Sequence, residues 1–156
     1  MSRIVVITGA SSGYGKACAE LFKKNGDTVI MTARNAEKLK NACEEVGGDM
    51  AVPMDVTVPA DWERLADTVR GKYGRLDILV NNAGGGIAIK EVTEQSTDEI
   101  DAVIKLNLNS VVYGCRAAAD IMTAQGSGTM IHIASVCDRE CWPPWSVSAA
   151  AKAGVL

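Results

Sequence analysis

The chain has 156 residues, a length typical of one domain with a substantial buried core. Hydrophobic residues make up 47% of it and charged residues 22%, as in ordinary soluble globular proteins. The net charge of −3 and the lack of a basic stripe argue against nucleic acid as a main partner. No apolar stretch approaches the roughly 20 residues that cross a bilayer, so we expect no membrane partner either.

The amino terminus and the cysteines bear on the cellular setting. The first predicted strand begins within a few residues of the start, which leaves no room for a signal peptide. Five cysteines, an odd number without paired metal-ligand spacing, indicate reduced thiols and a cytoplasmic protein. Cys137 and Cys141 are four residues apart, but the single histidine, His132, falls in a predicted strand, where it is expected to be a core residue. We therefore expect no metal site.

Strands and helices are expected to alternate along the chain. Short β-branched or apolar runs predict strands near 3–8, 27–32, 49–53, 76–81 and 128–135. Helical patterns predict helices at 13–25, 35–46, 59–73, 97–124 and from about 146 onward. Asn35 is placed to cap the second helix, and Pro59 suits a first turn. This order predicts one α/β domain over 1–156, a doubly wound parallel (Rossmann) sheet in three α/β/α layers.

A glycine-rich turn joins the first predicted strand to the first predicted helix. Its candidate cofactor-binding residues are Gly9, Ser11, Ser12, Gly13, Tyr14 and Gly15. Glycines permit a tight turn and a close approach of phosphates to the backbone, and the helix directs its free N–H groups and positive dipole end at the anion. The alternative is an ordinary strand–helix turn, but the apolar strand before the loop and the helix after it favour a nucleotide site.

The chain ends soon after its last predicted helix begins. That helix starts with the run 149–154, and two residues later the sequence stops. Its apolar face is then unmatched, and the last strand is left at the edge of the sheet, where association is a risk. We therefore expect the C-terminal strands of a longer single-domain protein to be missing.

Several motifs, taken in order, resemble the short-chain dehydrogenase/reductase family along the whole chain. They are the glycines Gly9, Gly13 and Gly15, the pair Asp55-Val56 after the third strand, Asn81-Asn82-Ala83-Gly84 after the fourth, Asn107, Ser135 and Lys152. The resemblance implies that Asp55 and Val56 contact adenine, and that Asn107 holds a water in a proton relay. It further implies that Lys152 binds the nicotinamide ribose and lowers the pKa of a neighbouring tyrosine.

The segment 82–84 and Ser135 also have a physical argument. Asn82, Ala83 and Gly84 follow a central strand, at the sheet edge where open α/β sheets bind ligands, although Asn and Gly are also common turn residues. Ser135 follows the fifth strand and is placed to donate a hydrogen bond to a substrate oxygen.

The end of the second predicted strand bears on the choice of cofactor. An acidic residue there would bind the ribose 2′-hydroxyl of NAD, but the chain has Ala33 followed by Arg34. A guanidinium suits bidentate contact with a phosphate. We predict NADP over NAD, although the glycine loop holds no second basic residue.

The catalytic tyrosine that the resemblance leads one to expect is absent. Its place, four residues before Lys152 and thirteen after Ser135, is held by Ser148. Serine is shorter than tyrosine and a much weaker acid. Loss of a positioned general acid typically lowers a rate by about 10²–10⁴-fold. We explain Ser148 first as an engineered substitution of the tyrosine. The second explanation is a natural relative that has lost its activity.

The leading hypothesis is an oxidoreductase that transfers a hydride between NADP(H) and a carbonyl or secondary alcohol, disabled here by Ser148. The alternative is an inactive nucleotide-binding module with a regulatory or scaffold role. The expected partner is a small carbonyl or alcohol whose identity stays open. The resemblance also implies a homo-dimer or tetramer in the full-length form.

Overall fold

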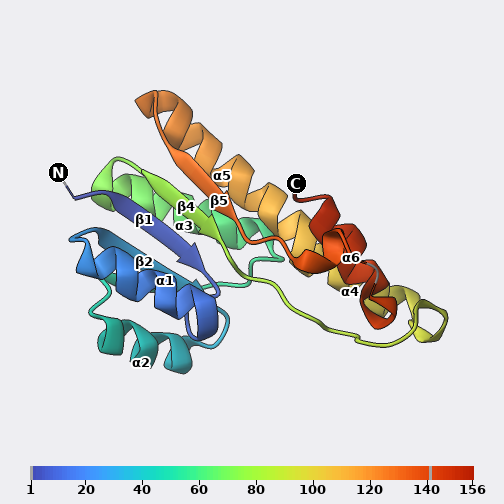
Figure 1. Ribbon diagram of the computed structural model, residues 1–156. Helices are drawn as coiled ribbons and strands as arrows, with labels where there is room; N and C mark the ends of the chain where they lie inside the picture. The colour runs from blue at the N-terminus through green and yellow to red at the C-terminus, as the bar shows by residue number, and fades with distance from the viewer. Residues whose placement is uncertain (1, 141) are drawn as a thin grey trace.

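The fold is described from a computed structural model, in which residues 2–140 and 142–156 are placed. One sheet of parallel strands in the order β3-β2-β1-β4-β5 forms its centre (Figure 1). The strands are β1 (Ile4–Thr8), β2 (Thr28–Ala33), β3 (Met50–Pro53), β4 (Ile78–Asn81) and β5 (Thr129–His132). The order reverses direction between β1 and β4, the switch point at which doubly wound sheets bind ligands.

Helices cover both faces of the sheet and give it three layers. They are α1 (Gly13–Lys24), α2 (Ala36–Val46), α3 (Pro59–Tyr73), α4 (Thr97–Ile104), α5 (Ser110–Gln125) and α6 (Ser146–Ala153). Short helical turns lie between them: η1 (Val92–Glu94), η2 (Lys105–Asn109), η3 (Val136–Asp138) and η4 (Pro143–Trp145). The doubly wound α/β prediction is thereby confirmed.

Alternating side chains of the central strands build a separate core on each face. Val5 and Ile7 of β1 pack with α1 and α2, whereas Val6 packs with α3 and α5. Because successive side chains of a strand point to opposite faces, a strand covered on both sides must be apolar throughout. All five residues of β1 are buried, as this argument requires.

Local signals fix where several helices begin. The Asn35 side chain accepts a hydrogen bond from the Lys38 amide at 2.8 Å, which caps α2 as predicted. Pro59 occupies the first turn of α3, also as predicted. Ser96 and Glu99 form a reciprocal capping box at the start of α4.

Two predicted elements differ from the structure. The helix expected over 97–124 is interrupted, because the turn η2 has π-helical hydrogen bonding between α4 and α5. The strand expected over 128–135 ends at His132, because β4 ends at Asn81 and offers no ladder partner beyond it. The last bond on this path joins the Ile133 amide to the Asn81 carbonyl at 3.0 Å.

His132 lies half-buried at the edge of the sheet, not in the centre of a core. Its Nδ1 lies 3.1 Å from the Asn81 amide nitrogen, and its Nε2 lies 3.7 Å from the Cys115 sulfur. Of the two cysteines singled out by their spacing, Cys137 is buried and Cys141 lies outside the described residues. Across residues 2–140 and 142–156, no helix is both long enough and apolar enough to cross a membrane.

Candidate functional site

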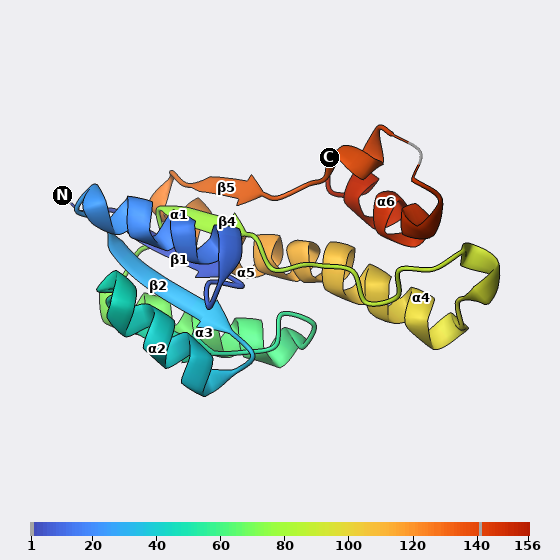
Figure 2. The same cartoon turned by 60° about the horizontal axis from the view of Figure 1, so that its bottom comes forward.

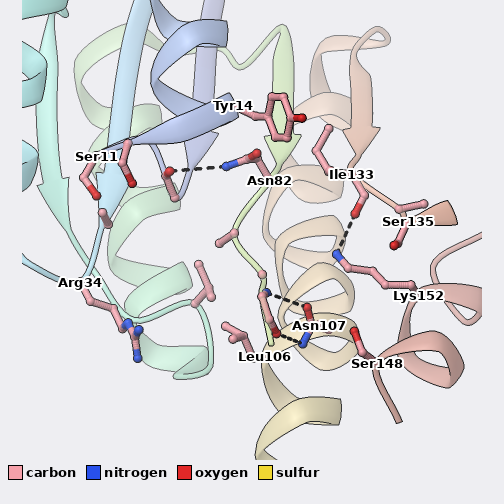
Figure 3. A pocket seen from close by; sticks show the side chains of 18 of the residues that line it. Ser11, Tyr14, Arg34, Asn82, Leu106, Asn107, Ile133, Ser135, Ser148 and Lys152 are labelled. Atoms are coloured by element: carbon pink, nitrogen blue, oxygen red, sulfur yellow. Dashed lines mark hydrogen bonds between the residues drawn. The ribbon is translucent and has the colours of Figure 1, made fainter. Parts of the chain in front are cut away.

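A cleft of about 890 Å³ opens at the carboxyl ends of the strands, between the glycine loop and α6 (Figure 3). Figure 2 shows that α4, α6 and the loop after β4 lie beyond this end of the sheet. Thirteen of the sixteen predicted site residues line the cleft. They are Gly9, Ser11, Ser12, Tyr14, Arg34, Val56, Asn82, Ala83, Gly84, Asn107, Ser135, Ser148 and Lys152.

The glycine loop packs directly against the end of β4. Gly9 has a φ of +65°, a backbone conformation that side chains disfavour. A Cβ on Gly15 would lie 2.5 Å from the Gly9 carbonyl oxygen, so only glycine permits this approach of α1 to the loop. Gly13 and Gly15 are not among the residues that line the cleft, and they shape it through the backbone.

Thr8 connects the glycine loop with the segment after β4. Its Oγ1 accepts hydrogen bonds from the amides of Asn82 and Ala83, each at 3.0 Å. The Asn82 side chain donates in return to the Thr8 carbonyl at 2.8 Å. The two walls of the cleft are therefore held together by side chains that end neighbouring strands.

Asn107 lies in the π-helical turn η2 and is fully buried. Its Oδ1 accepts from the Gly85 amide, and its Nδ2 donates to the Gly85 carbonyl, both at 3.0 Å. Nδ2 also donates to the Val103 carbonyl at 3.1 Å. The family resemblance implied that Asn107 holds a water in a proton relay, and in the structure its side chain holds the loop after β4.

Lys152 of α6 and Ser135, which follows β5, lie near each other on the same side of the cleft (Figure 3). The Lys152 ammonium donates to the Ile133 carbonyl at 2.7 Å, and burial lowers the pKa of Lys152. The Ser135 Oγ accepts from the Cys137 amide at 3.3 Å and from its thiol at 3.0 Å. Because a hydroxyl has two lone pairs and one proton, these contacts leave the Ser135 proton free for a ligand oxygen.

Ser148 lies one helical turn before Lys152 on α6, and both side chains line the cleft (Figure 3). Among the described residues, Tyr14 is the tyrosine that lines the cleft. It lies in the glycine-loop wall and is 83% exposed. Tyr73 and Tyr113 do not line the cleft. No phenol therefore reaches the Lys152 end of the cleft in the part of the chain that the structure describes.

The described charged side chains that line the cleft are all positive. Arg34, Lys38 and Lys152 line it, and no carboxylate does so among the described side chains, which do not include that of Asp138. The whole chain carries a net charge of −3, so the cleft is a local exception. Such a cavity attracts an anionic ligand.

Asp55, predicted to contact adenine, is not among the residues that line the cleft. Its carboxylate accepts from the amide and the hydroxyl of Thr57, at 2.9 and 2.8 Å, and so builds the turn before α3. Val56 does line the cleft. Sequence reasoning missed other lining residues, namely Ala33, Asn35, Lys38, Met54, Gly85, Leu106, Ile133, Ala134 and Trp145. Most adjoin the carboxyl end of a strand, a signal that could have found them.

A family model described as short chain dehydrogenase matches residues 3–156. The chain belongs to this family of oxidoreductases. It is 36% identical over 155 residues to an uncharacterized oxidoreductase of Staphylococcus aureus (strain USA300), covering 98% of this chain and 67% of that protein.

Two solved structures show the same likeness. A short-chain dehydrogenase from Streptomyces avermitilis superposes with a TM-score of 0.92 and 33% identity, over 99% of this chain and 57% of that one. A metagenomic short-chain oxidoreductase in complex with NADP superposes with a TM-score of 0.92 and 32% identity, over 98% of this chain and 71% of that one. The chain thus spans somewhat more than half to about two thirds of the length of such relatives.

Proposed function

We propose that this protein binds NADP(H) and derives from an enzyme that transfers a hydride between that cofactor and a carbonyl or secondary alcohol. The observation that carries the proposal is the cleft lined by Arg34, Lys38 and Lys152 without a described carboxylate. NADP carries one more phosphate than NAD, and a carboxylate at the ribose would repel it. The relative solved with NADP supports the same choice.

The residues around the cleft suit a dinucleotide. The turn from Gly9 to Gly15 and the first amides of α1 would hold the diphosphate, and Arg34 would meet the 2′-phosphate. Val56 would border the adenine, and Asn82, Ala83 and Gly84 would border the nicotinamide half. When bound, the cofactor supplies or accepts the hydride; the protein orients the substrate oxygen.

At the reacting end, the described side chains offer hydrogen-bond donors. The Ser135 hydroxyl has its lone pairs engaged and its proton free, and the Lys152 ammonium has donors beyond the one given to Ile133. Donors suit a carbonyl oxygen or an alkoxide. Asn107 would act by positioning Gly85 and the loop after β4.

The missing part is the acid that shuttles the proton. Ser148 stands where a phenol would be needed beside Lys152, and its hydroxyl is too weak an acid to share a proton near neutral pH. We therefore infer that this chain binds the cofactor but catalyses slowly. An inactive nucleotide-binding module with a regulatory role is the second candidate function, favoured by Ser148 alone.

Cofactor choice is tested by titrating the purified protein with NADPH and then NADH while following nicotinamide fluorescence. We expect NADPH to bind more tightly. Equal or tighter binding of NADH would contradict the role of Arg34, and no binding of either would contradict the proposed function as a whole.

Catalysis is tested with Ser148→Tyr, which restores a phenol one turn from Lys152. We expect a gain of about 10²–10⁴-fold in NADPH oxidation over a panel of ketones and aldehydes. Ser146→Tyr is the matched control, because Ser146 is exposed on the same helix and does not line the cleft. If Ser148→Tyr binds NADPH but gains nothing over Ser146→Tyr, the regulatory candidate is favoured.

A further inference from the structure

We propose that the carbonyl or alcohol substrate of this site is aromatic, and that its ring stacks on the indole of Trp145. The inference rests on the proposed function, because it concerns the substrate that would bind in the same cleft. It goes beyond that function, which leaves the class of carbonyl or alcohol open.

The three tryptophans of the chain have different surroundings. Trp62 is buried in the core, and its Nε1 donates to the Val56 carbonyl at 2.9 Å. Trp142 is 45% exposed, and its Nε1 donates to the Glu140 carboxylate at 3.2 Å. Trp145 is half-buried, and among the described residues it is the tryptophan that lines the cleft. Its indole is therefore the one that a ligand in the cleft can reach.

The indole of Trp145 is held in place by the chain on both sides. Pro143 and Pro144 precede it in the turn η4, and their rings restrict the backbone there. The loop after β4 packs against the indole at Gly86. A Cβ on Gly86 would lie 3.0 Å from the indole Cζ3 and 2.9 Å from the Ile89 Cδ1, so a glycine permits this approach. An aromatic surface that is already positioned binds a ligand at a lower entropic cost.

Trp145 is close in the fold to the residues of the reacting end. It comes three residues before Ser148, where η4 leads into α6, and residues at this spacing on a helix are neighbours. Both line the cleft, together with Ser135 and Lys152, which offer donors to a substrate oxygen. A ring bonded to the carbonyl carbon would therefore lie beside the indole when its oxygen meets these donors.

The other side chains at this end of the cleft suit a flat apolar group. Leu106 and Trp145 are apolar, and the amides of Asn82 and Asn107 already donate to backbone carbonyls. A sugar or polyol would need free polar groups of this kind for its hydroxyls. An aromatic ring is favoured over an aliphatic one, since two stacked rings gain about two- to tenfold in affinity beyond the burial of their area.

The test compares acetophenone with cyclohexyl methyl ketone, two probes that differ in whether the ring is aromatic. Calorimetry measures their binding to the protein loaded with NADP⁺, in which a ketone cannot be reduced. The kcat/KM of each ketone with NADPH is measured in Ser148→Tyr. We expect both measurements to favour acetophenone about two- to tenfold.

Variants of two tryptophans then assign this preference to a residue. Trp145→Leu should remove the preference, and Trp145→Phe, which keeps a ring, should retain most of it. Trp142→Leu is the matched control and should retain all of it, because Trp142 does not line the cleft. NADPH affinity and thermal unfolding of each variant show whether the cofactor site and the fold are intact.

The remaining outcomes separate the two proposals. If the unaltered protein binds NADPH but binds the two ketones equally, or binds neither, the aromatic assignment is wrong and the proposed cofactor stands. A preference that survives Trp145→Leu, or that Trp142→Leu removes to the same extent, also overturns the assignment. If the unaltered protein binds neither NADPH nor NADH, the proposed function fails instead.

Discussion

Gly15 determines how closely the first turn of α1 approaches the glycine loop. A Cβ at this position would lie 2.5 Å from both the Gly9 carbonyl oxygen and the Asn82 side-chain nitrogen. A Cβ atom does not approach other non-bonded heavy atoms that closely, so the loop or the helix would have to move. Since the same loop would hold the diphosphate, a change at Gly15 affects both folding and binding.

We predict that Gly15→Ala destabilises the protein by about 1–3 kcal/mol, the usual range for overpacking, and weakens NADPH binding. Gly71→Ala is the matched control, because a Cβ on this exposed glycine of α3 meets no atom within 4 Å. It should stabilise the protein by about 0.4–1 kcal/mol through the unfolded chain. Urea unfolding and NADPH titration measure both effects; if the two variants behave alike, the packing argument fails.

The sequence predicts the position of some site residues in the structure but not of others. The family resemblance implied that Ser135, Ser148 and Lys152 belong to one site, and all three line the cleft. The bonds from Asn107 to Gly85 were not predictable, because they depend on a π-helical turn that no local signal marks. Lys38 was missed because a lysine in a first turn is usually a solvated charge, and only the strand order brings it to the cleft.

At the scale of the elements, two carboxylates fix β1 at the end opposite the cleft. Asp27 is buried and accepts from the Arg3 side chain at 2.9 and 2.6 Å. Asp77 accepts from the Ile4 amide at 2.7 Å and pairs with Arg75. Arg3 holds the pKa of the Asp27 carboxyl below its ordinary value. Burial opposes ionisation of Asp77, yet hydrogen bonds from Arg75 and Ile4 keep its pKa lowered as well.

These lowered pKa values give the stability a definite pH dependence. Between the folded and unfolded pKa values the unfolded chain binds more protons, so stability falls as pH falls. The contribution is complete above about pH 4, the value of an unperturbed aspartate, and is lost as pH drops through the folded pKa.

We predict that Asp27→Asn costs about 1–2 kcal/mol at neutral pH, and that its stability declines less than that of the unaltered protein below about pH 4. Urea unfolding across pH measures both. Asp67→Asn, at an exposed carboxylate paired with Arg70, is the control and should change little. An equal loss in the two variants would show that Asp27 contributes no more than a surface charge.

The boundaries of the elements show what sequence patterns can predict. Caps and first-turn residues such as Asn35 and Pro59 act locally, and the starts they predicted are within one residue of those observed. The end of β5 depends on where β4 stops, which is a contact between distant segments. The break at η2 likewise separates α4 from α5 without a glycine or proline in the turn.

At the scale of the whole molecule, alternation of apolar strands and amphipathic helices was sufficient to predict the doubly wound sheet. The positive charge of the cleft could not be predicted in this way, because Arg34, Lys38 and Lys152 come from separate segments and the chain as a whole is acidic. Strand order brings their side chains to one end of the sheet.

The two edge strands of the sheet, β3 and β5, differ in how well they are protected against pairing with another chain. On one side, β3 ends in Pro53, which has no N–H to offer another strand. On the other side, β5 has exposed residues at Thr129 and Ile131, with 39% of Ile131 accessible. An edge strand with an apolar exposed residue and no proline or charge within it favours pairing with another chain.

We therefore predict that the protein, as this chain, self-associates with rising concentration through β5, and that Ile131→Lys reduces this association because a charge on an edge strand disfavours pairing. Light scattering and sedimentation over a concentration series measure it. Leu21→Lys is the control, since Leu21 is 62% exposed and belongs to α1, not to β5. NADPH binding should be unaffected in both variants, because neither residue lines the cleft. If Leu21→Lys reduces association as much as Ile131→Lys, surface apolarity drives it and the open edge of β5 does not.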